Sequence, residues 1–241
     1  MNHRNARQHL VAMLRVKAPF AIILALAVVH LVIELQSEPA NVNRIYECFG
    51  LQRETFWSGR IWQPLTYGFL HGGTFHLFVN CIGIALLGSQ VEHIFGPKRF
   101  LRLCLMGLLG GGLAHLVVSQ SGPEAPILVG FSAAVMALLL LLTTLSPDSR
   151  LWLIPLRGRA LGLGLLTAEG VLALIDPALG LPWLSDAGRW ISHHGGNSWF
   201  QIAHACHFGG GLIGWLCGRW VLRNRVTLES LRRARERREA Q

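Results

Sequence analysis

The sequence contains few charged residues for its length. Asp, Glu, Lys and Arg make up 15% of its 241 residues, whereas hydrophobic residues make up 51%. A soluble globular domain typically carries about 25% charged residues, so this composition argues against a soluble protein. The five cysteines include no CxxC pair, which disfavours both a disulfide framework and a zinc site. The sequence also lacks HExxH, the helical motif by which many metalloproteases bind zinc.

Positive charge is concentrated near the two ends of the chain. Of the 22 Lys and Arg residues, four precede residue 18 and eight lie from Arg219 onward. This distribution is typical of the cytoplasmic flanks of a membrane protein, and it does not build the basic groove that nucleic acids require. We therefore predict that the chain contacts a lipid bilayer and binds neither nucleic acid nor metal.

Six apolar segments have about the length of a membrane helix. They cover residues 18–35, 74–90, 100–119, 127–145, 160–179 and 200–222. The fifth segment is the least apolar, because it contains Glu169, Asp176 and Pro177. The sequence therefore predicts an all-α membrane protein. Its predicted parts are a basic N-terminal tail (1–17), a domain of six transmembrane helices (18–222) and a basic C-terminal tail (223–241).

The Lys and Arg residues between these segments predict how the helices are oriented. Four regions are basic: the N-terminal tail, the 96–99 turn, the 147–159 connection and the C-terminal tail. With six spans, all four lie on one side of the membrane, which is then the cytoplasmic side. We predict cytoplasmic termini, and a plasma (inner) membrane location if the source is bacterial. The long connection 36–74 then lies on the outer side, where its aromatic residues can rest at the membrane interface.

A serine and a histidine are predicted to lie at similar depth in two of the helices. Ser132 comes about six residues into the fourth segment, and His207 about seven residues into the sixth. At about 1.5 Å per residue, both would lie roughly 8–11 Å below the outer surface. Gly130 allows a sharp turn before Ser132, which then falls in the first turn of a helix. The free N–H groups and the dipole at such a helix start favour a developing oxyanion.

Small residues would let the two helices approach each other closely. Glycines follow His207 at four-residue spacing: Gly210, Gly214 and Gly218. Alanines follow Ser132 at the same spacing: Ala133 and Ala137. Such patterns are typical of close contacts between membrane helices. A simpler interpretation stays open, in which Ser132 is only a packing site and His207 is hydrogen-bonded within the bundle. His204 competes with His207, but it lies off the glycine face.

The second apolar segment adds two polar residues near its outer end. His76 and Asn80 are four residues apart, so they share one face of a helix. Their predicted depth is similar to that of Ser132, where side-chain donors could hold an oxyanion. A serine hydroxyl needs a base before it becomes a good nucleophile, and a neutral histidine can act as that base near neutral pH. Because polar residues inside a membrane are costly, this group indicates a functional site.

The order of these motifs resembles that of the rhomboid family of intramembrane serine proteases. The matching motifs are His71-(x4)-His76-(x3)-Asn80, Gly130-x-Ser132 and His207-x-x-Gly210-x-x-x-Gly214. The resemblance implies a bundle of six helices with a water-filled cavity that opens to the outer side. It implies a dyad of Ser132 as nucleophile and His207 as base, without an aspartate. It further implies that His76 and Asn80 help to form the oxyanion hole, that single-span membrane proteins are the substrates, and that no cofactor is needed.

Three positions differ from the family pattern. Ala133 stands where a glycine commonly follows the serine, and Met136 stands where a tyrosine often stacks on the histidine. Gln63 replaces the arginine of a Trp-Arg pair, so we expect the first connection to be held less firmly. Two other classes of protein stay open. A catalytically inactive rhomboid-like membrane adaptor would be expected to lack the serine or the histidine, and a polytopic transporter would be expected to show inverted repeats, which are not visible.

Overall fold

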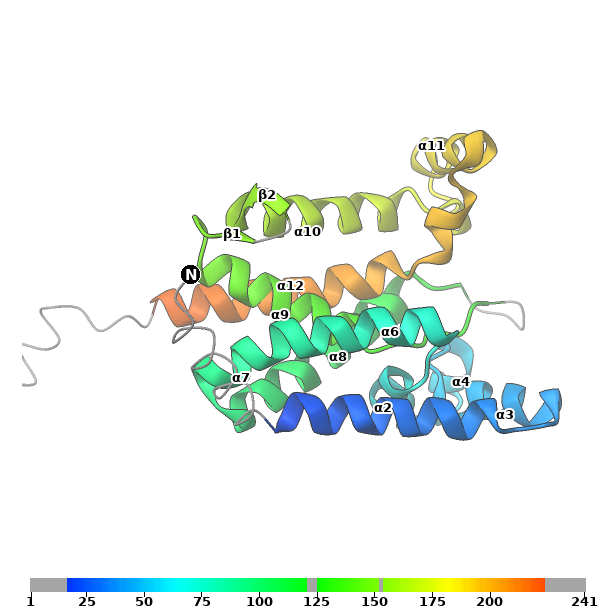
Figure 1. Ribbon diagram of the computed structural model, residues 1–241. Coiled ribbons are helices and arrows are strands. Elements are labelled where there is room, and N and C mark those ends of the chain that lie inside the picture. The colour runs from blue at the N-terminus through cyan, green and yellow to red at the C-terminus, as the bar shows by residue number, and fades with distance from the viewer. Residues whose placement is uncertain (1–16, 121–124, 152–153, 224–241) are drawn as a thin grey trace, which may run out of the picture.

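The computed structural model describes residues 17–120, 125–151 and 154–223 (Figure 1). The two predicted basic tails lie outside the described residues, apart from Lys17 and Arg223. Within the described part, the chain is mostly helical. The longest helices are α2 (Ala18–Glu34), α8 (Pro97–Val118), α9 (Ser132–Leu145), α10 (Gly158–Leu174) and α12 (His204–Arg223), together with a helix from Thr74 to Phe95. This last helix consists of α6 (Thr74–Gly83), a π-helical segment η2 (Ile84–Gly88) and α7 (Ser89–Phe95).

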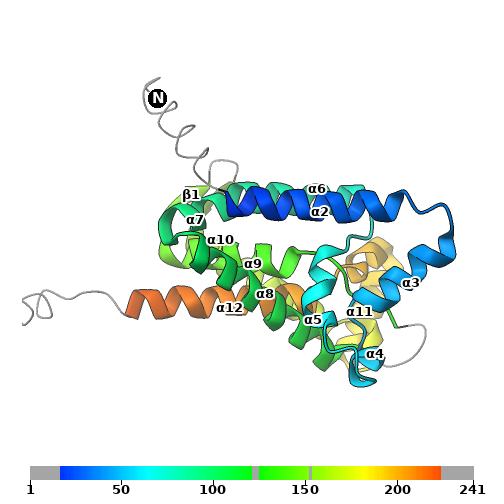
Figure 2. The same cartoon turned by 90° about the horizontal axis from the view of Figure 1, so that it is seen from below.

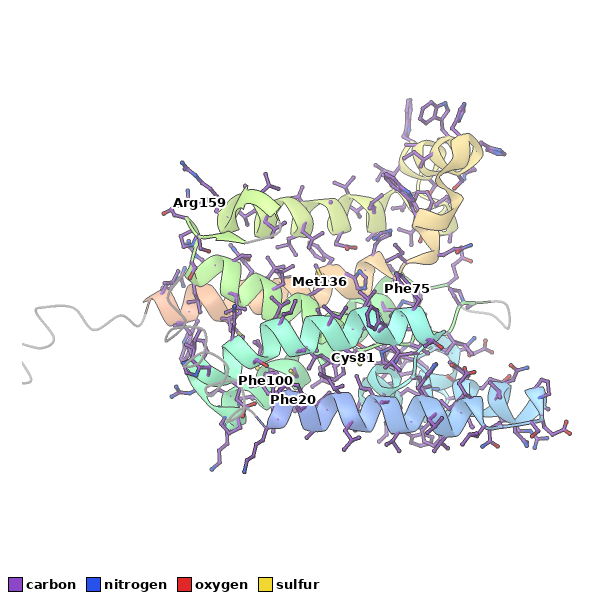
Figure 3. The ribbon with its side chains drawn as sticks, in the orientation of Figure 1. Phe20, Phe75, Cys81, Phe100, Met136 and Arg159 are labelled. Atoms are coloured by element: carbon purple, nitrogen blue, oxygen red, sulfur yellow. The ribbon has the colours of Figure 1, made fainter. Side chains whose placement is uncertain are left out.

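Each predicted apolar segment overlaps one of these helices. By length and composition, Thr74–Phe95 and Pro97–Val118 are suited to crossing a membrane, whereas α2 and α9 are apolar but shorter. The mostly helical fold is therefore confirmed, and the crossing of a membrane by six helices stays a prediction. Large apolar side chains face outward on several helices, including Phe20 of α2 (50% exposed) and Phe75 of α6 (79% exposed), both labelled in Figure 3. Lipid would remove this surface from water.

The fourth predicted helix is shorter than expected. The sequence predicted a helix from residue 127, whereas α9 begins at Ser132 and has 14 residues. The reason is Gly130, whose φ of +115° lies in the left-handed region and cannot continue a right-handed helix. The sixth helix also starts late, at His204. Ser132 and His207 are thus the first and fourth residues of their helices, not the sixth and seventh.

The connections contain more regular structure than the sequence indicated. Residues 36–74 form α3 (Pro39–Phe49), α4 (Arg53–Trp57), α5 (Gln63–Thr66) and the 3-10 turn η1 (Tyr67–Phe69). Between α9 and α10, β1 (Arg150–Leu151) and β2 (Ile154–Arg157) pair as an antiparallel hairpin, which the all-α prediction missed. After α10 come η3 (Pro177–Leu179), α11 (Leu184–Ile191), η4 (Ser192–Gly196) and η5 (Asn197–Gln201).

The expected loosening around Gln63 is not observed. The Gln63 side chain is fully buried. Its amide donates to the carbonyl oxygen of Glu47 (3.1 Å) and accepts from the Thr55 hydroxyl (2.9 Å). The neighbouring Trp62 indole donates to the carbonyl oxygen of Cys48 (2.9 Å). A glutamine at position 63 therefore ties α3, α4 and α5 together by neutral hydrogen bonds, each of which typically contributes about 0.5–1.5 kcal/mol.

The helices run side by side, and their connections gather at two ends (Figures 1 and 2). The start of α2, the α7–α8 turn, the β1–β2 hairpin and the end of α12 lie at one end, whereas α3, α4 and α11 lie at the other. Because α9 and α12 both start at the end that carries α11, the first residues of these two helices lie close together.

The contact between α9 and α12 is made through backbone atoms. A β-carbon at Gly210 would lie 2.2 Å from the carbonyl oxygen of Ala133, and one at Gly214 would lie 2.1 Å from that of Ala137. Helix α8 joins the same contact, because a β-carbon at Gly111 of α8 would lie 2.5 Å from the Ala133 β-carbon and 2.7 Å from the carbonyl oxygen of Cys206 in α12. Real β-carbons do not approach so closely, so only glycine fits these positions. The predicted glycine face of α12 is therefore confirmed.

Candidate active site

Ser132 is placed by a short extended segment that is fixed to the first connection. Leu51 and Leu128 exchange two backbone hydrogen bonds of 3.0 and 2.9 Å. The N–H of Gly130 donates to the carbonyl oxygen of Tyr67 at 3.0 Å. The hydroxyl of Tyr67, itself fully buried, donates to the carbonyl oxygen of Leu108 at 2.8 Å. The residues before Ser132 therefore have a fixed backbone, and α9 starts from a defined position.

His76 occupies the space that a side chain at position 130 would need. A β-carbon built on Gly130 would lie 2.6 Å from Cε1 and 2.7 Å from Nε2 of His76. Glycine is thus required at position 130 both by its positive φ and by this imidazole. As a result, the structure places His76 next to the turn that precedes Ser132.

Ser132 and His207 are joined by a hydrogen bond. The Ser132 hydroxyl lies 2.8 Å from Nε2 of His207, which is the normal distance for such a bond. The other ring nitrogen, Nδ1, lies 3.2 Å from Oε1 of Glu169 in α10. An ionised carboxylate can only accept hydrogen bonds. With Glu169 ionised, Nδ1 therefore carries the hydrogen of a neutral His207, and Nε2 is free to accept the hydroxyl proton.

His204 makes different contacts, although it lies only one turn from His207. Its Nδ1 is 2.6 Å from Oε2 of Glu169, and its Nε2 is 2.8 Å from the carbonyl oxygen of Trp199. Both ring nitrogens are therefore engaged away from Ser132. Of the two candidate histidines, the structure brings His207 to the serine.

Asn80 and His71 complete the polar surroundings of His76. The buried Asn80 amide donates to the carbonyl oxygen of His76 at 3.0 Å, within the same helix. The ring of His71 stands edge-on to that of His76, with 5.1 Å between centroids. Burial, and secondarily the nearby His76 and His30, lower the pKa of His71 from 6.5 to about 4. His71 is thus a neutral packing partner of His76 at neutral pH.

Two of the positions that differ from the family pattern, Ala133 and Met136, lie in the packed interior. Ala133 is fully buried between α8 and α12. Met136, labelled in Figure 3, packs with Leu140 and Leu166 in a cluster that also includes Phe208. The cluster around Met136 joins α9, α10 and α12.

Glu169 is the residue of this site that the sequence interpretation missed. From the sequence, Glu169 is only one of the three residues that make the fifth segment the least apolar. The available signal was an acidic residue within an apolar helix, which by itself points to a functional partner. What the sequence could not show is that the partners are two histidines on another helix.

Comparison with known proteins decides the family. The sequence matches the Rhomboid domain over residues 58–224, which is more than half of the chain. The chain belongs to the rhomboid family. Rhomboid proteins are integral membrane proteins, in agreement with the apolar helices of this one.

Curated relatives include both organellar and inactive rhomboids. The chain is 32% identical over 135 residues to the mitochondrial RHOMBOID-like protein 12 of Arabidopsis thaliana, covering 49% of this chain and 40% of the relative. It is 38% identical over 68 residues to the chloroplastic Rhomboid-like protein 16 of the same plant (28% and 21%). It is 41% identical over 59 residues to the plant's Inactive RHOMBOID-like protein 8 (24% and 17%). The matched regions span less than half of the length of these relatives.

Proposed function

We propose that this rhomboid protein is an intramembrane serine endopeptidase, in which Ser132 is the nucleophile and His207 the general base. The observation that carries the proposal is the 2.8 Å hydrogen bond from the Ser132 hydroxyl to Nε2 of His207. A nucleophile and a base within hydrogen-bond reach are the geometric requirement for this chemistry. The other ring nitrogen of His207, Nδ1, lies 3.2 Å from Oε1 of Glu169.

The reaction proceeds in two halves. Ser132 Oγ attacks the carbonyl carbon of the scissile peptide bond while its proton passes to His207 Nε2. The C–N bond breaks, the imidazolium returns the proton to the leaving amine, and the acyl group stays on Oγ. A water molecule then attacks the ester and gives its proton to His207. Collapse of the second intermediate releases the carboxylic acid, and the proton returns to Ser132, so that one peptide bond and one water are consumed.

The start of α9 offers donors for the oxyanion. The N–H groups of Ala134 and Val135 already donate to the carbonyl oxygen of Phe131. Among the described residues, no backbone acceptor is found for the N–H groups of Ser132 and Ala133. These two N–H groups and the positive end of the helix dipole favour negative charge beside Oγ. We assign the same role to the His76 ring and to the second amide hydrogen of Asn80.

The membrane arrangement follows from the same geometry. In this proposal six helices cross the bilayer, and the end that carries the start of α2 and the end of α12 faces the cytoplasm. Ser132 and His207, at the first turns of α9 and α12, then lie near the outer face. The substrates are single-span membrane proteins, cleaved within or next to their transmembrane helix. The support is the apolar outer surface of the helices and the basic residues near both ends of the chain.

A catalytically inactive rhomboid is the second candidate, because one of the relatives carries that name. The hydrogen-bonded Ser132–His207 pair argues against it. A serine-directed fluorophosphonate distinguishes the two, since an activated serine displaces fluoride from phosphorus and becomes labelled. We expect labelling of the parent protein in detergent and none of Ser132→Ala. Equal labelling of both proteins, or of neither, would contradict the proposal.

A further inference from the structure

The carboxylate of Glu169 lies between two histidines of α12. Its Oε1 is 3.2 Å from Nδ1 of His207, and its Oε2 is 2.6 Å from Nδ1 of His204. We propose that Glu169 is a positioning residue that extends the Ser132–His207 dyad to a triad, with His204 as the anchor of the carboxylate. This inference rests on the proposed function, because a base must act on Ser132 for its positioning to matter.

The order of contacts is that of a serine, histidine and acid triad. Ser132 Oγ lies 2.8 Å from Nε2 of His207. Nδ1 of the same ring lies 3.2 Å from Oε1 of Glu169. In such triads the acid holds the imidazole in the tautomer that accepts the hydroxyl proton, and it stabilises the imidazolium that forms. Three different helices supply the three groups: α9, α12 and α10.

The Glu169 side chain is too deeply buried for its contacts with the two histidines to be incidental. The side chains of Glu169, His204 and His207 are 11%, 6% and 17% exposed. A carboxylate buried among apolar helices carries a large desolvation cost unless it is paired and hydrogen-bonded. Glu169 meets that condition with one histidine on each oxygen.

His204 fixes the carboxylate from the side opposite His207. A carbonyl oxygen only accepts, so Nε2 of His204 carries a hydrogen that it donates to Trp199. The ionised carboxylate of Glu169 likewise only accepts, so Nδ1 of His204 also carries a hydrogen and donates it to Oε2 at 2.6 Å. With both ring nitrogens protonated, His204 is an imidazolium that pairs with the carboxylate. This pair holds Oε2 at His204, while Oε1 lies beside His207.

The competing explanation is that Glu169 and His204 form only a structural pair. Two variants separate the explanations, because each breaks the contact between Glu169 and His204. Glu169→Gln also removes the negative charge beside His207, whereas His204→Phe keeps that charge and the size of the ring. A structural pair predicts similar losses of turnover for both variants, and a triad predicts a much larger loss for Glu169→Gln.

The test measures kcat and KM of each purified variant for a transmembrane substrate. The concentration of active sites is titrated with a fluorophosphonate, so that kcat is expressed per active site. Thermal melting of each variant is measured alongside. Charge-assisted hydrogen bonds are the strong ones, so we expect Glu169→Gln to lower kcat about 10- to 100-fold with KM nearly unchanged. Glu169→Asp keeps the charge and should recover part of the rate. His204→Phe should melt at a lower temperature but lose less kcat than Glu169→Gln.

Two outcomes would overturn the inference. One is wild-type kcat in Glu169→Gln, and the other is an equal loss of kcat in Glu169→Gln and His204→Phe with no recovery in Glu169→Asp. Per-site kcat keeps the comparison valid even where a variant folds poorly. Ser132→Ala distinguishes this failure from failure of the proposed function. An inactive Ser132→Ala together with a fully active Glu169→Gln would contradict only the triad. An active Ser132→Ala would contradict the protease assignment itself.

Discussion

Gly210 of α12 packs directly against the backbone of Ala133 in α9. A β-carbon at position 210 would lie 2.2 Å from the carbonyl oxygen of Ala133. This contact sets the spacing of α9 and α12 one residue beyond Ser132 and three residues beyond His207. The 2.8 Å hydrogen bond between these two residues therefore depends on a glycine at position 210.

Substitutions at Gly210 should separate nucleophile and base. We expect Gly210→Ala to destabilise the protein by about 1–3 kcal/mol through overpacking, and Gly210→Leu by more. Because a displacement of about 1 Å can cost about 10²-fold in rate, substrate cleavage should fall by at least about tenfold in Gly210→Ala. Gly164→Ala in α10 is the matched control, since a β-carbon there meets nothing within 4 Å. Full cleavage activity in Gly210→Leu would show that this contact does not position the site.

Gly130→Ala tests the turn before Ser132. The new β-carbon would collide with the His76 ring, so we expect cleavage activity to fall together with thermal stability. Gly59→Ala controls for backbone strain, because Gly59 has a similar φ (+108° against +115°) and open space around it. Both variants should lose about 1 kcal/mol or more through strain, and only Gly130→Ala should lose activity beyond that. Equal turnover by the two variants would argue against a role for His76 at the site.

His76→Ala and Asn80→Ala test the oxyanion assignment. Loss of one oxyanion donor costs about 10²–10³ in rate, so each variant should retain slow cleavage that is measurable above that of Ser132→Ala. KM should change little, because these donors act on charge that develops only in the transition state. A rise in KM at constant kcat would instead assign His76 and Asn80 to substrate binding.

The sequence predicted those parts of the site whose residues recur at helical spacing within a single helix. Glycines at 210, 214 and 218 and the pair His76 and Asn80 follow helical spacing, so their common faces could be inferred. The start of α9 was misplaced by five residues, because apolar residues continue before Gly130 in an extended segment that pairs with Leu51. Hydrophobicity alone does not distinguish a buried extended segment from a helix.

Glu169 and Gln63 were misjudged for a related reason. Each is a single polar residue whose partners come from elsewhere in the chain: His204 and His207 for Glu169, and Glu47 and Thr55 for Gln63. No local spacing encodes such pairings, since they depend on how helices pack. The sequence could therefore suggest that a buried polar residue needs partners, but not which ones.

His71 should make the stability of the protein depend on pH. Its pKa is about 4 in the folded protein against 6.5 for an ordinary histidine. Between these values the unfolded chain binds a proton at His71 that the folded protein does not, so stability falls as the pH falls from 6.5 towards 4. The contribution is about 3 kcal/mol, at about 1.4 kcal/mol per pKa unit. His71→Leu should show a shallower decline of melting temperature over this range, and parallel curves for the two proteins would contradict the assignment.

The measurement that tests the account most directly is the turnover of a model transmembrane substrate by Ser132→Ala, His207→Ala and the double variant, each purified and checked for folding by thermal melting. Nucleophile and base act as one unit, so we expect each single variant to lose cleavage and the double variant to be no slower than either. Wild-type-like turnover in His207→Ala would show that His207 is not the base. Unchanged turnover in Ser132→Ala would contradict the proposed protease function altogether.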